Sequence, residues 1–490
     1  MLSRHGVEHH LLDANIEGML HLFELPPPSD ALTDAWTKRA FKNRRENLST
    51  LRDKDVYLHF ARYTRTVQDI SRVLARASVP GTKIGLADYT QKGLSPVRSS
   101  DLLAASERPD MNPFYPYFRR RLGALIDRNR PSALGISLNY LSQALTAFSM
   151  AGFIRREYPE MKIILGGGLV TSWIKSLKGS NPFTGLVDHM VAGPGEHQLL
   201  SLLGIDAAGD TLPKPDYQSL PRDQYLSPGF ILPYSASTGC YWNKCAFCPE
   251  QAEGNPYIPV PPQQVVADLM VLKEEVHPAL IHLLDNAISP AVLKALCTDN
   301  PGIPWYGFAR IGPHLADADF CVAMKRAGCI MLKLGIESGD QHLLDKLDKG
   351  ISVEMASVVL RNLKKAGIAT YVYLLFGTPE ENERAARKTL TFTVRHSDCI
   401  DYLNLAIFNM PVCGRNSSDI KTKGFYEGDL SLYTDFAHPL GWDRKRVRLF
   451  LEQEFRRHPA VSSILKNEPV TFTSNHAPFF AMARSADPHK

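Results

Sequence analysis

Three cysteines crowd into one short segment of the chain, and their spacing suits an iron–sulfur cluster. Cys240, Cys245 and Cys248 lie in the segment STGCYWNKCAFC, residues 237–248. Each thiolate of such a loop can bind a different iron of a cubane cluster, which leaves the fourth iron without a cysteine. An open iron can take the amino and carboxylate groups of a small molecule. The loop therefore predicts a [4Fe-4S] cluster that binds a ligand and reduces it.

Structural zinc is the alternative for the same loop. A closed zinc site needs four ligands, usually two pairs of cysteine or histidine, and the loop has no second pair beside it. The remaining cysteines are scattered, which does not indicate a disulfide scaffold; they are Cys297, Cys321, Cys329, Cys399 and Cys413. Cys413 follows the last strand-like run and is either a catalytic thiol or hydrogen donor, or an inert buried cysteine.

The cysteine loop follows the first of six strand-like runs in residues 231–415. Helical patterns separate these runs, so the series predicts a partial (β/α)6 barrel, in which chemistry sits at the carboxyl ends of the strands. Asp285 and Asn286 end the second run and face the same rim as the loop. The six runs are 233–239, 280–286, 305–310, 330–338, 370–377 and 402–409.

Residues 1–205 predict a separate α/β domain. Apolar runs alternate with helical patterns, with a helix expected at 142–157, so we expect a doubly wound, Rossmann-like parallel sheet. A strand at 7–13 has too little chain before it, so the usual first strand is expected to be missing. Glycine-rich turns follow two runs, where such sheets bind ligands. The runs with strand character are 56–60, 83–87, 133–138 and 162–165.

Three further segments complete the organisation of the chain. Prolines stop regular structure over 206–230, which predicts a linker. Residues 26–50 are proline-rich and then charged, and we expect a surface insertion there. The extension 416–490 is expected to be irregular, with one amphipathic helix near 444–457, and to cap the open side of the barrel.

Composition limits the partners. The net charge of +5 is too small to argue for nucleic acid. No apolar stretch approaches the roughly 20 residues of a membrane span, and the N-terminus lacks a signal peptide, so a cytoplasmic protein is expected.

The cysteine loop, with Phe247 before its last cysteine, resembles the signature of the radical SAM superfamily. That signature has three residues between its first two cysteines, whereas this chain has four, Tyr241 to Lys244. The second gap matches the family. The resemblance implies that the cluster binds S-adenosylmethionine (SAM) and cleaves it reductively, with electrons from a flavodoxin- or ferredoxin-type donor.

Later motifs extend the resemblance to the barrel. Residues 334–339 resemble the family motif whose acidic residue, here Glu337, binds the ribose hydroxyls of SAM, with Ser338 and Gly339 beside it. Gly377 and Pro379 resemble the glycine–proline turn of the family. Three further residues each have two interpretations: Arg310 pairs with the SAM carboxylate or forms a structural salt bridge, and Ile407 and Phe408 touch the adenine or pack in the core.

The order of the segments resembles the radical SAM subfamily with an N-terminal cobalamin (B12)-binding domain. The resemblance implies that the loops of this domain hold the cofactor. The Asp-x-His-x-x-Gly element that supplies a lower histidine ligand is absent, because residues 187–190 (VDHM) lack its spacing. The implied cofactor-binding residues are Ser137, Gly166, Gly167, Gly168, Gly193, Gly195 and Glu196.

These observations predict a radical SAM enzyme. The hypothesis is that the reduced cluster cleaves SAM to methionine and a 5′-deoxyadenosyl radical, which removes a hydrogen from the substrate. With cobalamin, methyl transfer to carbon is expected. Without it, a cyclisation, rearrangement or oxidation is expected, with a vestigial B12 domain. The cysteine loop would also suit a degenerate cluster-binding scaffold or a tRNA-modifying enzyme, although no basic tail supports the latter.

Overall fold

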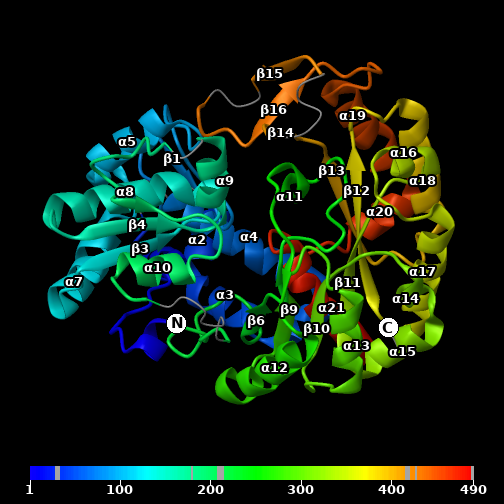
Figure 1. The fold of residues 1–490 in the computed structure, drawn as a ribbon, viewed down its shortest axis with the longest axis horizontal. Coiled ribbons are helices and arrows are strands. Elements are labelled where there is room, and N and C mark those ends of the chain that lie inside the picture. Colours follow the sequence, from blue (N-terminus) through cyan, green and yellow to red (C-terminus); the bar gives the residue numbers. More distant parts are fainter. Residues whose placement is uncertain (28–33, 178–179, 207–213, 414–419, 425–427, 487–490) are drawn as a thin grey trace. The chain divides into compact units, whose positions relative to one another are not determined.

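The computed structural model describes residues 1–490 except 28–33, 178–179, 207–213, 414–419, 425–427 and 487–490 (Figure 1). The chain divides into two compact units. The first comprises Met1–Leu48, Thr66–Gln224 and Gly424–Thr434, and the second comprises Ser49–Arg65, Tyr225–Lys423 and Asp435–Lys490. One boundary, after Gln224, falls inside the expected linker 206–230, whose described residues form no helix or strand.

The second unit is built on a sheet of six parallel strands that run across the sheet in chain order (Figure 1). Each strand corresponds to one of the six expected runs, so the partial (β/α)6 barrel is confirmed. Most strand residues are buried, as expected for a parallel sheet covered on both faces. The strands are β6 (Ile231–Tyr234), β9 (Leu280–Leu283), β10 (Trp305–Ala309), β11 (Cys329–Glu337), β12 (Ala369–Phe376) and β13 (Tyr402–Ile407).

Helices connect these strands and cover one face of the sheet. α15 contacts β11 and α17 contacts β12, and α15 and α17 also contact each other. α17 begins where Ser352 accepts a hydrogen bond from the Met355 amide, and it ends at Gly367 with φ +73°. The helices are α12 (Pro262–Val276), α13 (Pro290–Thr298), α14 (Pro313–Ala316), α15 (Ala318–Arg326), α16 (Gln341–Lys346), α17 (Val353–Ala366) and α18 (Glu383–Arg395).

The opposite face of the sheet, which we call the inner face, carries tyrosines whose hydroxyls bond to the C-terminal extension. Tyr306, Tyr371 and Tyr402, near the amino ends of their strands, donate to the Asn475 side chain (3.2 Å), to Glu468 (2.5 Å) and to the Ala477 carbonyl (3.1 Å), respectively. The extension therefore covers the amino-terminal end of the inner face.

The expectation of an irregular extension with a single helix was wrong. The extension holds α19 (Arg444–Phe450), the π-helix η6 (Leu451–Phe455), α20 (Pro459–Leu465) and α21 (Thr473–Ala486). α20 spans only seven residues and α21 contains Pro478, so neither shows the long, clean periodicity that predicts a helix. Short strands complete this region: β14 (Met410–Pro411), β15 (Thr422–Gly424) and β16 (Tyr433–Phe436).

The first unit contains a parallel sheet in the order β3-β4-β5, which confirms the α/β class. Within the described residues the strand order does not reverse, so these three strands contain no doubly wound switch point. The elements are β3 (Ala133–Ser137), α8 (Leu141–Glu157), β4 (Lys162–Gly166), α9 (Gly168–Ser176), β5 (His189–Met190) and α10 (Glu196–Leu202).

Three expectations for the N-terminal region were wrong. Residues 7–13 form no strand, because Asp13 already caps α1 by accepting from the Asn15 and Ile16 amides. The run 56–60 lies in the 3-10 helix η2 and the start of α4. Only the start of the run 83–87 is a strand, β1 (Thr82–Ile84), which pairs antiparallel with β2 (Tyr89–Gln91). Short apolar runs do not distinguish strand from helix.

The remaining elements of the N-terminal region are mostly helical. The expected insertion 26–50 contains two helices, α2 and α3. The elements are η1 (Leu2–His5), α1 (Ala14–Glu24), α2 (Ala35–Lys42), α3 (Arg44–Leu51), η2 (Lys54–Leu58), α4 (Phe60–Arg76), β1 (Thr82–Ile84), β2 (Tyr89–Gln91), α5 (Ser99–Glu107), η3 (Pro109–Met111), α6 (Tyr115–Tyr117), η4 (Phe118–Gly123, a π-helix) and α7 (Ala124–Asn129).

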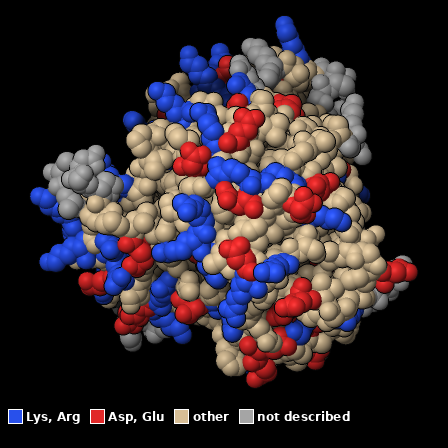
Figure 2. All heavy atoms as spheres, turned by 90° about the vertical axis from the view of Figure 1, so that its left-hand side faces the viewer, with Lys and Arg blue, Asp and Glu red and all other residues tan. Residues whose placement is uncertain are grey.

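The surface charge and the lengths of the helices bear on possible partners. On the face drawn in Figure 2, basic and acidic side chains are interspersed and do not gather into one basic surface. Among the described residues, no helix has both the length and the apolar character needed to cross a membrane.

Candidate functional site

The cysteine loop leaves the sheet at the carboxyl end of β6. A short strand, β7 (Ser237–Thr238), pairs antiparallel with β8 (Ile258–Pro259) and closes the base of the loop. Gly239 follows with φ +69°, and a Cβ there would lie 2.3 Å from the Pro256 carbonyl oxygen. Only glycine fits this close approach, so the glycine before Cys240 has a structural reason.

The end of β9 holds the loop from one side. The buried Asp285 carboxylate accepts hydrogen bonds from the Ala236 amide (3.0 Å) and the Ser237 hydroxyl (2.5 Å). Asn286 donates to the Gly239 carbonyl at 3.2 Å. Burial raises the pKa of Asp285, and these hydrogen bonds oppose that shift. The structure places Asp285 and Asn286 at the rim, as expected, where they position the loop.

The segment after α16 holds the loop from the other side. The Ala246 amide donates to the Leu347 carbonyl (3.0 Å), and the Trp242 indole N–H donates to the Asp348 carbonyl (2.9 Å). Trp242 belongs to the longer first gap between the cysteines. Residues 347–350, which we call the clamp segment, therefore bond to both gaps of the cysteine motif.

Phe247 has a packing role. Its ring lies against the buried cluster of Leu343, Leu347 and Ala385. The Lys349 ammonium lies 5.5 Å from the ring centre. The side chain thus anchors the loop to α16 and α18, which is a different contact from the cofactor contact expected for it.

The three thiols are half-buried and lie close enough to influence one another. Burial raises the pKa of Cys245 to about 11, and the charge of Lys349 opposes this shift. Cys248 also has its pKa raised by burial, and the charge of Cys240 adds to it. The arrangement is a compact group of thiols beside cationic side chains.

Zinc and a cubane cluster make different demands on the thiols. A tetrahedral zinc site needs four ligands around one ion, whereas each thiolate of a cubane cluster binds a different iron. Within the described part of the chain, no group of three or more His, Cys, Asp or Glu side chains is arranged to hold a single metal ion.

Arg310 lies between the cysteine loop and the clamp segment. Its guanidinium stacks on the Trp242 ring, 3.7 Å from the ring centre. Nη2 donates to the carbonyls of Lys349 (2.5 Å) and Gly350 (2.8 Å). Among the described residues, the buried Nη1 has no hydrogen-bond partner. An orphaned guanidinium nitrogen near the thiols fits a ligand that brings a carboxylate.

Glu337 ends β11 in a strained conformation. Its φ is +65°, a left-handed value that is uncommon for a residue with a side chain. The carboxylate forms a nearly buried ion pair with Lys349 at 2.8 Å. Gly335 leaves the space for this pair, since a Cβ there would lie 2.5 Å from a Glu337 oxygen. Strain of this kind concentrates at ligand sites.

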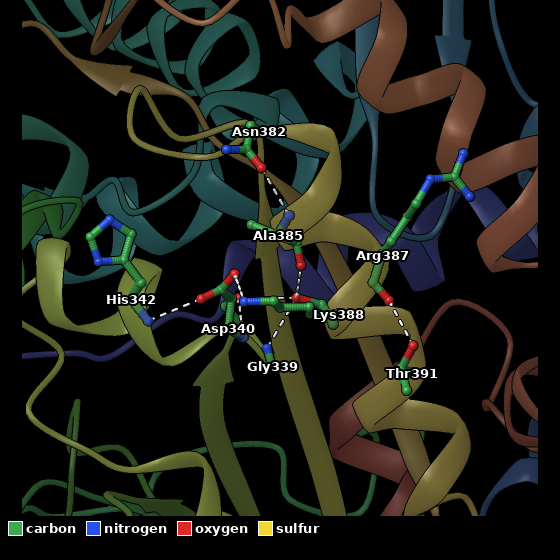
Figure 3. Close-up of polar contacts among 10 residues, drawn as sticks. Gly339, Asp340, His342, Asn382, Ala385, Arg387, Lys388 and Thr391 are labelled. Atoms are coloured by element: carbon green, nitrogen blue, oxygen red, sulfur yellow. Dashed lines mark hydrogen bonds and ion pairs between the residues drawn. The ribbon is translucent and has the colours of Figure 1, made fainter.

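Ser338 and Gly339 dock the end of β11 onto α18. Figure 3 shows Gly339 beside Lys388 of this helix. The Ser338 hydroxyl lies 3.0 Å from the Thr389 hydroxyl, and the Gly339 amide donates to the same oxygen at 3.0 Å. A Cβ on Gly339 would lie 2.6 Å from Phe392 Cβ. Both residues therefore position Glu337, and the fully buried Ser338 hydroxyl already has its partners.

The Gly377 turn is held by a buried carboxyl. The Gly377 amide donates to Glu381, and the Trp442 indole N–H donates to the same oxygen at 3.0 Å. Burial raises the pKa of Glu381 to about 8, so the group is largely protonated at neutral pH. The C-terminal extension, through Trp442, thus stabilises the turn that resembles the family motif.

Two more contacts surround this turn. His438 Nε2 donates to the Thr378 carbonyl at 2.8 Å, and Pro379 is buried in the turn. Ile407 is half-buried at the end of β13, and its Cγ2 would lie 3.8 Å from a Cβ on Gly377. It therefore lies beside the turn.

Phe408 and Cys413 follow the last barrel strand, β13. Phe408 is buried, and its ring packs against Phe436 with the ring centres 5.9 Å apart. This supports core packing as the role of Phe408. Cys413 is exposed, so the expectation of a buried inert cysteine was wrong.

In the first unit, the expected cofactor loops meet at one edge because β3, β4 and β5 are parallel. Gly167 has φ +105°, and a Cβ there would lie 2.5 Å from the Leu138 carbonyl oxygen. The Asn139 side chain accepts from the Gly168 amide (2.9 Å) and donates to the Ser137 hydroxyl (3.2 Å).

The third loop follows β5. The Gly193 amide donates to the Thr171 hydroxyl at 2.9 Å, and nothing lies within 4 Å of the position of a Cβ on Gly193. Gly195 and Glu196 form the start of α10. The carboxyl edge of the sheet is thus lined by backbone turns with open space beside Gly193, which suits a large ligand that approaches the main chain.

Segment 187–190 lies at the last strand of this sheet. His189 belongs to β5, where it pairs with Ile164. Its neighbour Asp188 accepts from the Ile163 amide and pairs with Arg155 at 2.7 Å. His189 and Met190 therefore form the strand, and Asp188 is bonded to β4 beside it.

The comparisons agree with this geometry. Residues 234–393 match the model of the Radical SAM superfamily. An uncharacterized methyltransferase of Pyrococcus horikoshii is 23% identical over 58% of this chain and 68% of its own length. The hopanoid C-3 methylase of Methylococcus capsulatus is 23% identical over 64% of this chain and 65% of its own length.

A solved structure is also similar in part. The cobalamin-dependent SAM radical enzyme OxsB with aqua-cobalamin bound has a TM-score of 0.48 and 17% identity. The match covers 76% of this chain and 55% of that one. This chain thus spans about two thirds of each of these two curated relatives and about half of the OxsB chain.

Residues 234–393 therefore carry a radical SAM domain, and the family of that domain uses a [4Fe-4S] cluster and SAM. The domain indicates an enzyme, and the two curated relatives just described are named a methyltransferase and a methylase.

Sequence reasoning missed two residues of the site. Lys349 pairs with Glu337, and Trp242 stacks on Arg310. Lys349 lies in an ordinary charged run, which gives no signal. Trp242 lies between the first two cysteines, in the gap that is one residue longer than in the family signature. An aromatic residue in this longer gap was the one feature of the sequence that could have indicated its role.

Proposed function

We propose that this protein is a radical SAM methyltransferase, with the cluster and SAM at the carboxyl rim of the barrel and cobalamin on the first unit. The observation that carries the proposal is the cysteine loop, which is bonded on one side to Asp285 and on the other to the clamp segment. The unpartnered Nη1 of Arg310 and the strained Glu337 lie at the same rim.

The residues at this rim would have separate roles. Cys240, Cys245 and Cys248 would each bind one iron, which leaves the fourth iron for SAM. When bound, the cluster supplies the electron that cleaves SAM to methionine and a 5′-deoxyadenosyl radical. Arg310 would hold the SAM carboxylate through Nη1, and Glu337 would accept hydrogen bonds from the ribose hydroxyls.

Lys349 links these two roles. It pairs with Glu337, and its own carbonyl accepts from Arg310. The ion pair orients the Glu337 carboxylate before a ligand arrives, and a preorganised acceptor costs less to align. Apolar packing around Phe247 keeps water from the inner side of the loop.

The methyl-transfer assignment draws on the names of the curated relatives and on the first unit. When bound, cobalamin supplies a cobalt atom that can carry a methyl group. Ser137, Gly166, Gly167, Gly168, Gly193, Gly195 and Glu196 would line its site. Segment 187–190 lacks the residue spacing of the motif that supplies a lower histidine ligand. A small-molecule substrate and a flavodoxin- or ferredoxin-type electron donor complete the proposal.

The decisive experiment is anaerobic purification after expression with hydroxocobalamin, followed by iron and cobalt counts and an assay of SAM cleavage. About four irons with stoichiometric cobalt and SAM cleavage would support the full proposal. Four irons without cobalt would favour a cobalamin-independent cyclisation, rearrangement or oxidation and would overturn the cobalamin part. A chain that takes up no iron on reconstitution would overturn the whole assignment.

Cysteine variants test the cluster ligands. C240A, C245A and C248A should each lose cluster iron and SAM cleavage together, because each thiolate binds its own iron. Cys297 is half-buried on α13 and serves as the control. C297A should keep the iron content and cleavage rate of the wild type. Full cleavage by any of the three loop variants would contradict the proposed ligand set.

A further inference from the structure

A buried lysine lies on the inner face of the barrel sheet, away from the cysteine loop. Lys333 is in the middle of β11 and only 5% exposed. In the sheet it lies beside Phe308 of β10 and Tyr371 of β12. Its ammonium lies 4.3 Å from the centre of the Phe308 ring and 5.5 Å from that of Tyr306.

The hydrogen-bond partner of Lys333 is uncharged. The ammonium lies 2.9 Å from His282 Nε2, and the His282 ring stacks on Tyr306 with 4.3 Å between centres. Burial and the charge of Lys333 lower the pKa of His282 to about 3, so this histidine is neutral and accepts the hydrogen bond. No carboxylate among the described residues lies within ion-pair distance of Lys333.

The polar groups around Lys333 already have partners. The hydroxyls of Tyr306, Tyr371 and Tyr402 bond to the C-terminal extension. Tyr373 is half-buried, its ring centre 4.9 Å from that of Phe308, and it bonds to Ser474. Glu468, an acidic residue at this face, accepts the hydrogen bond of the Tyr371 hydroxyl.

Lys333 is therefore a buried cation beside aromatic rings, with no counter-charge among the described residues. Burial alone lowers its pKa to about 8, so it still carries charge at neutral pH. Contacts with aromatic rings and one neutral acceptor offset only part of the cost of burying an ammonium ion. Charged groups kept under such conditions concentrate at functional sites.

We propose that Lys333 binds an anionic oxygen group of the substrate, a carboxylate or a phosphate, on the inner face of the barrel. An apolar part of the substrate would lie against the half-buried rings of Phe308 and Tyr373. This inference rests on the proposed function, since it names the class of substrate that the barrel takes. Lys333 lies on the same strand as Glu337, four residues before it, or roughly 13 Å along an extended chain.

Binding of small aromatic probes to the reconstituted full-length protein tests the site. Phenylacetate and phenyl phosphate carry the two anionic groups, and phenylacetamide is the neutral analogue. The wild type should bind at least one anion at least ten-fold more tightly than the amide, and the tighter of the two identifies the group. K333M should lose this preference. K294M, at an exposed lysine of α13, should keep it.

The pH dependence of anion binding by the wild type provides a second test, which does not require K333M to fold. Affinity for the preferred anion should fall as pH rises above about 8, where Lys333 loses its proton. The other groups facing Lys333 are His282, already neutral, and the tyrosines Tyr306 and Tyr371, whose burial raises their pKa values above this range. Binding of the amide should stay constant.

Equal binding of the anions and the amide by the wild type, or an unchanged preference in folded K333M, would overturn the Lys333 site. The absence of binding by all three probes would overturn it as well. Reductive cleavage of SAM by the wild-type enzyme is measured separately. Failure of that reaction would count against the proposed function, whereas failure of the probe test with cleavage intact counts against the Lys333 site alone.

Discussion

Trp242 shows how a single residue accommodates the longer gap between the first two cysteines. Asn243 takes a left-handed conformation, with φ +42°, and lets the loop turn back. The Trp242 ring then lies under the Arg310 guanidinium and over Gly350, where a Cβ would come within 2.2 Å of the ring. The extra residue is thus absorbed by a stacking contact that also orients Arg310.

Replacing Trp242 tests this role. W242A removes a cation–π contact and a hydrogen bond, each worth about 1 kcal/mol, so the Kd for SAM should rise about ten-fold or more. W242F keeps the ring and loses only the bond to Asp348, so its Kd should rise only a few-fold. SAM titrations followed by the electron paramagnetic resonance of the reduced cluster, with iron counts, measure both. Wild-type affinity in W242A with full iron would contradict the positioning role.

At the scale of elements, the site is assembled from loops that follow parallel strands. Asp285, Arg310, Glu337 and Gly377 lie at the ends of four different strands, and they share one rim because parallel strands place their carboxyl ends at one edge. The turns are stiffened by contacts from elsewhere in the second unit, such as Thr389 of α18 beneath Gly339.

Glu381 makes the Gly377 turn sensitive to pH. Its pKa is about 8 in the folded chain and 4.5 in its ordinary state, so the folded state holds the proton over a wider range. The free energy of unfolding should therefore fall as pH rises from about 4.5 to about 8, by a few kcal/mol at about 1.4 kcal/mol per pKa unit. E381Q should flatten this dependence. Urea unfolding between pH 5 and 8.5 measures it.

Glu383 provides a matched control for this experiment, because it lies two residues further along and is exposed. E383Q should keep the wild-type slope of stability against pH. The same slope in E381Q and the wild type would show that the buried carboxyl does not ionise in this range.

At the scale of the whole molecule, the second unit is made from three separated stretches of chain. His476 of α21 joins them. Its Nδ1 lies 3.2 Å from the Tyr57 hydroxyl and 3.0 Å from that of Tyr63, and its ring bonds to the backbone at Leu226. The C-terminal extension is therefore part of the barrel core.

Protonation of His476 should loosen this junction. Burial lowers its pKa to about 3, from an ordinary value of 6.5, so the unfolded chain takes up the proton first as pH falls. Stability should decrease from pH 6.5 downward. H476Q should start less stable and show a shallower decrease between pH 6.5 and 4.5 in urea unfolding. H59Q, at an exposed histidine of the same unit, should keep the steep decrease.

The sequence by itself determined the six barrel strands and the cysteine motif. Continuous apolar runs such as 330–338 are the local signature of a parallel strand covered on both faces, and three cysteines within nine residues stay together in any fold. The order of the strands also placed Asp285, Arg310 and Glu337 at one rim, because successive parallel strands end at the same edge.

Only the tertiary structure decided which distant groups meet. The pairing of Lys349 with Glu337, the stack of Trp242 on Arg310 and the Lys333–His282 contact join residues 12 to 68 positions apart. The short run at 56–60 became helix because its apolar residues pack against α21, a partner more than 400 positions away. Such contacts depend on chain reversal and packing, which leave no trace in local spacing.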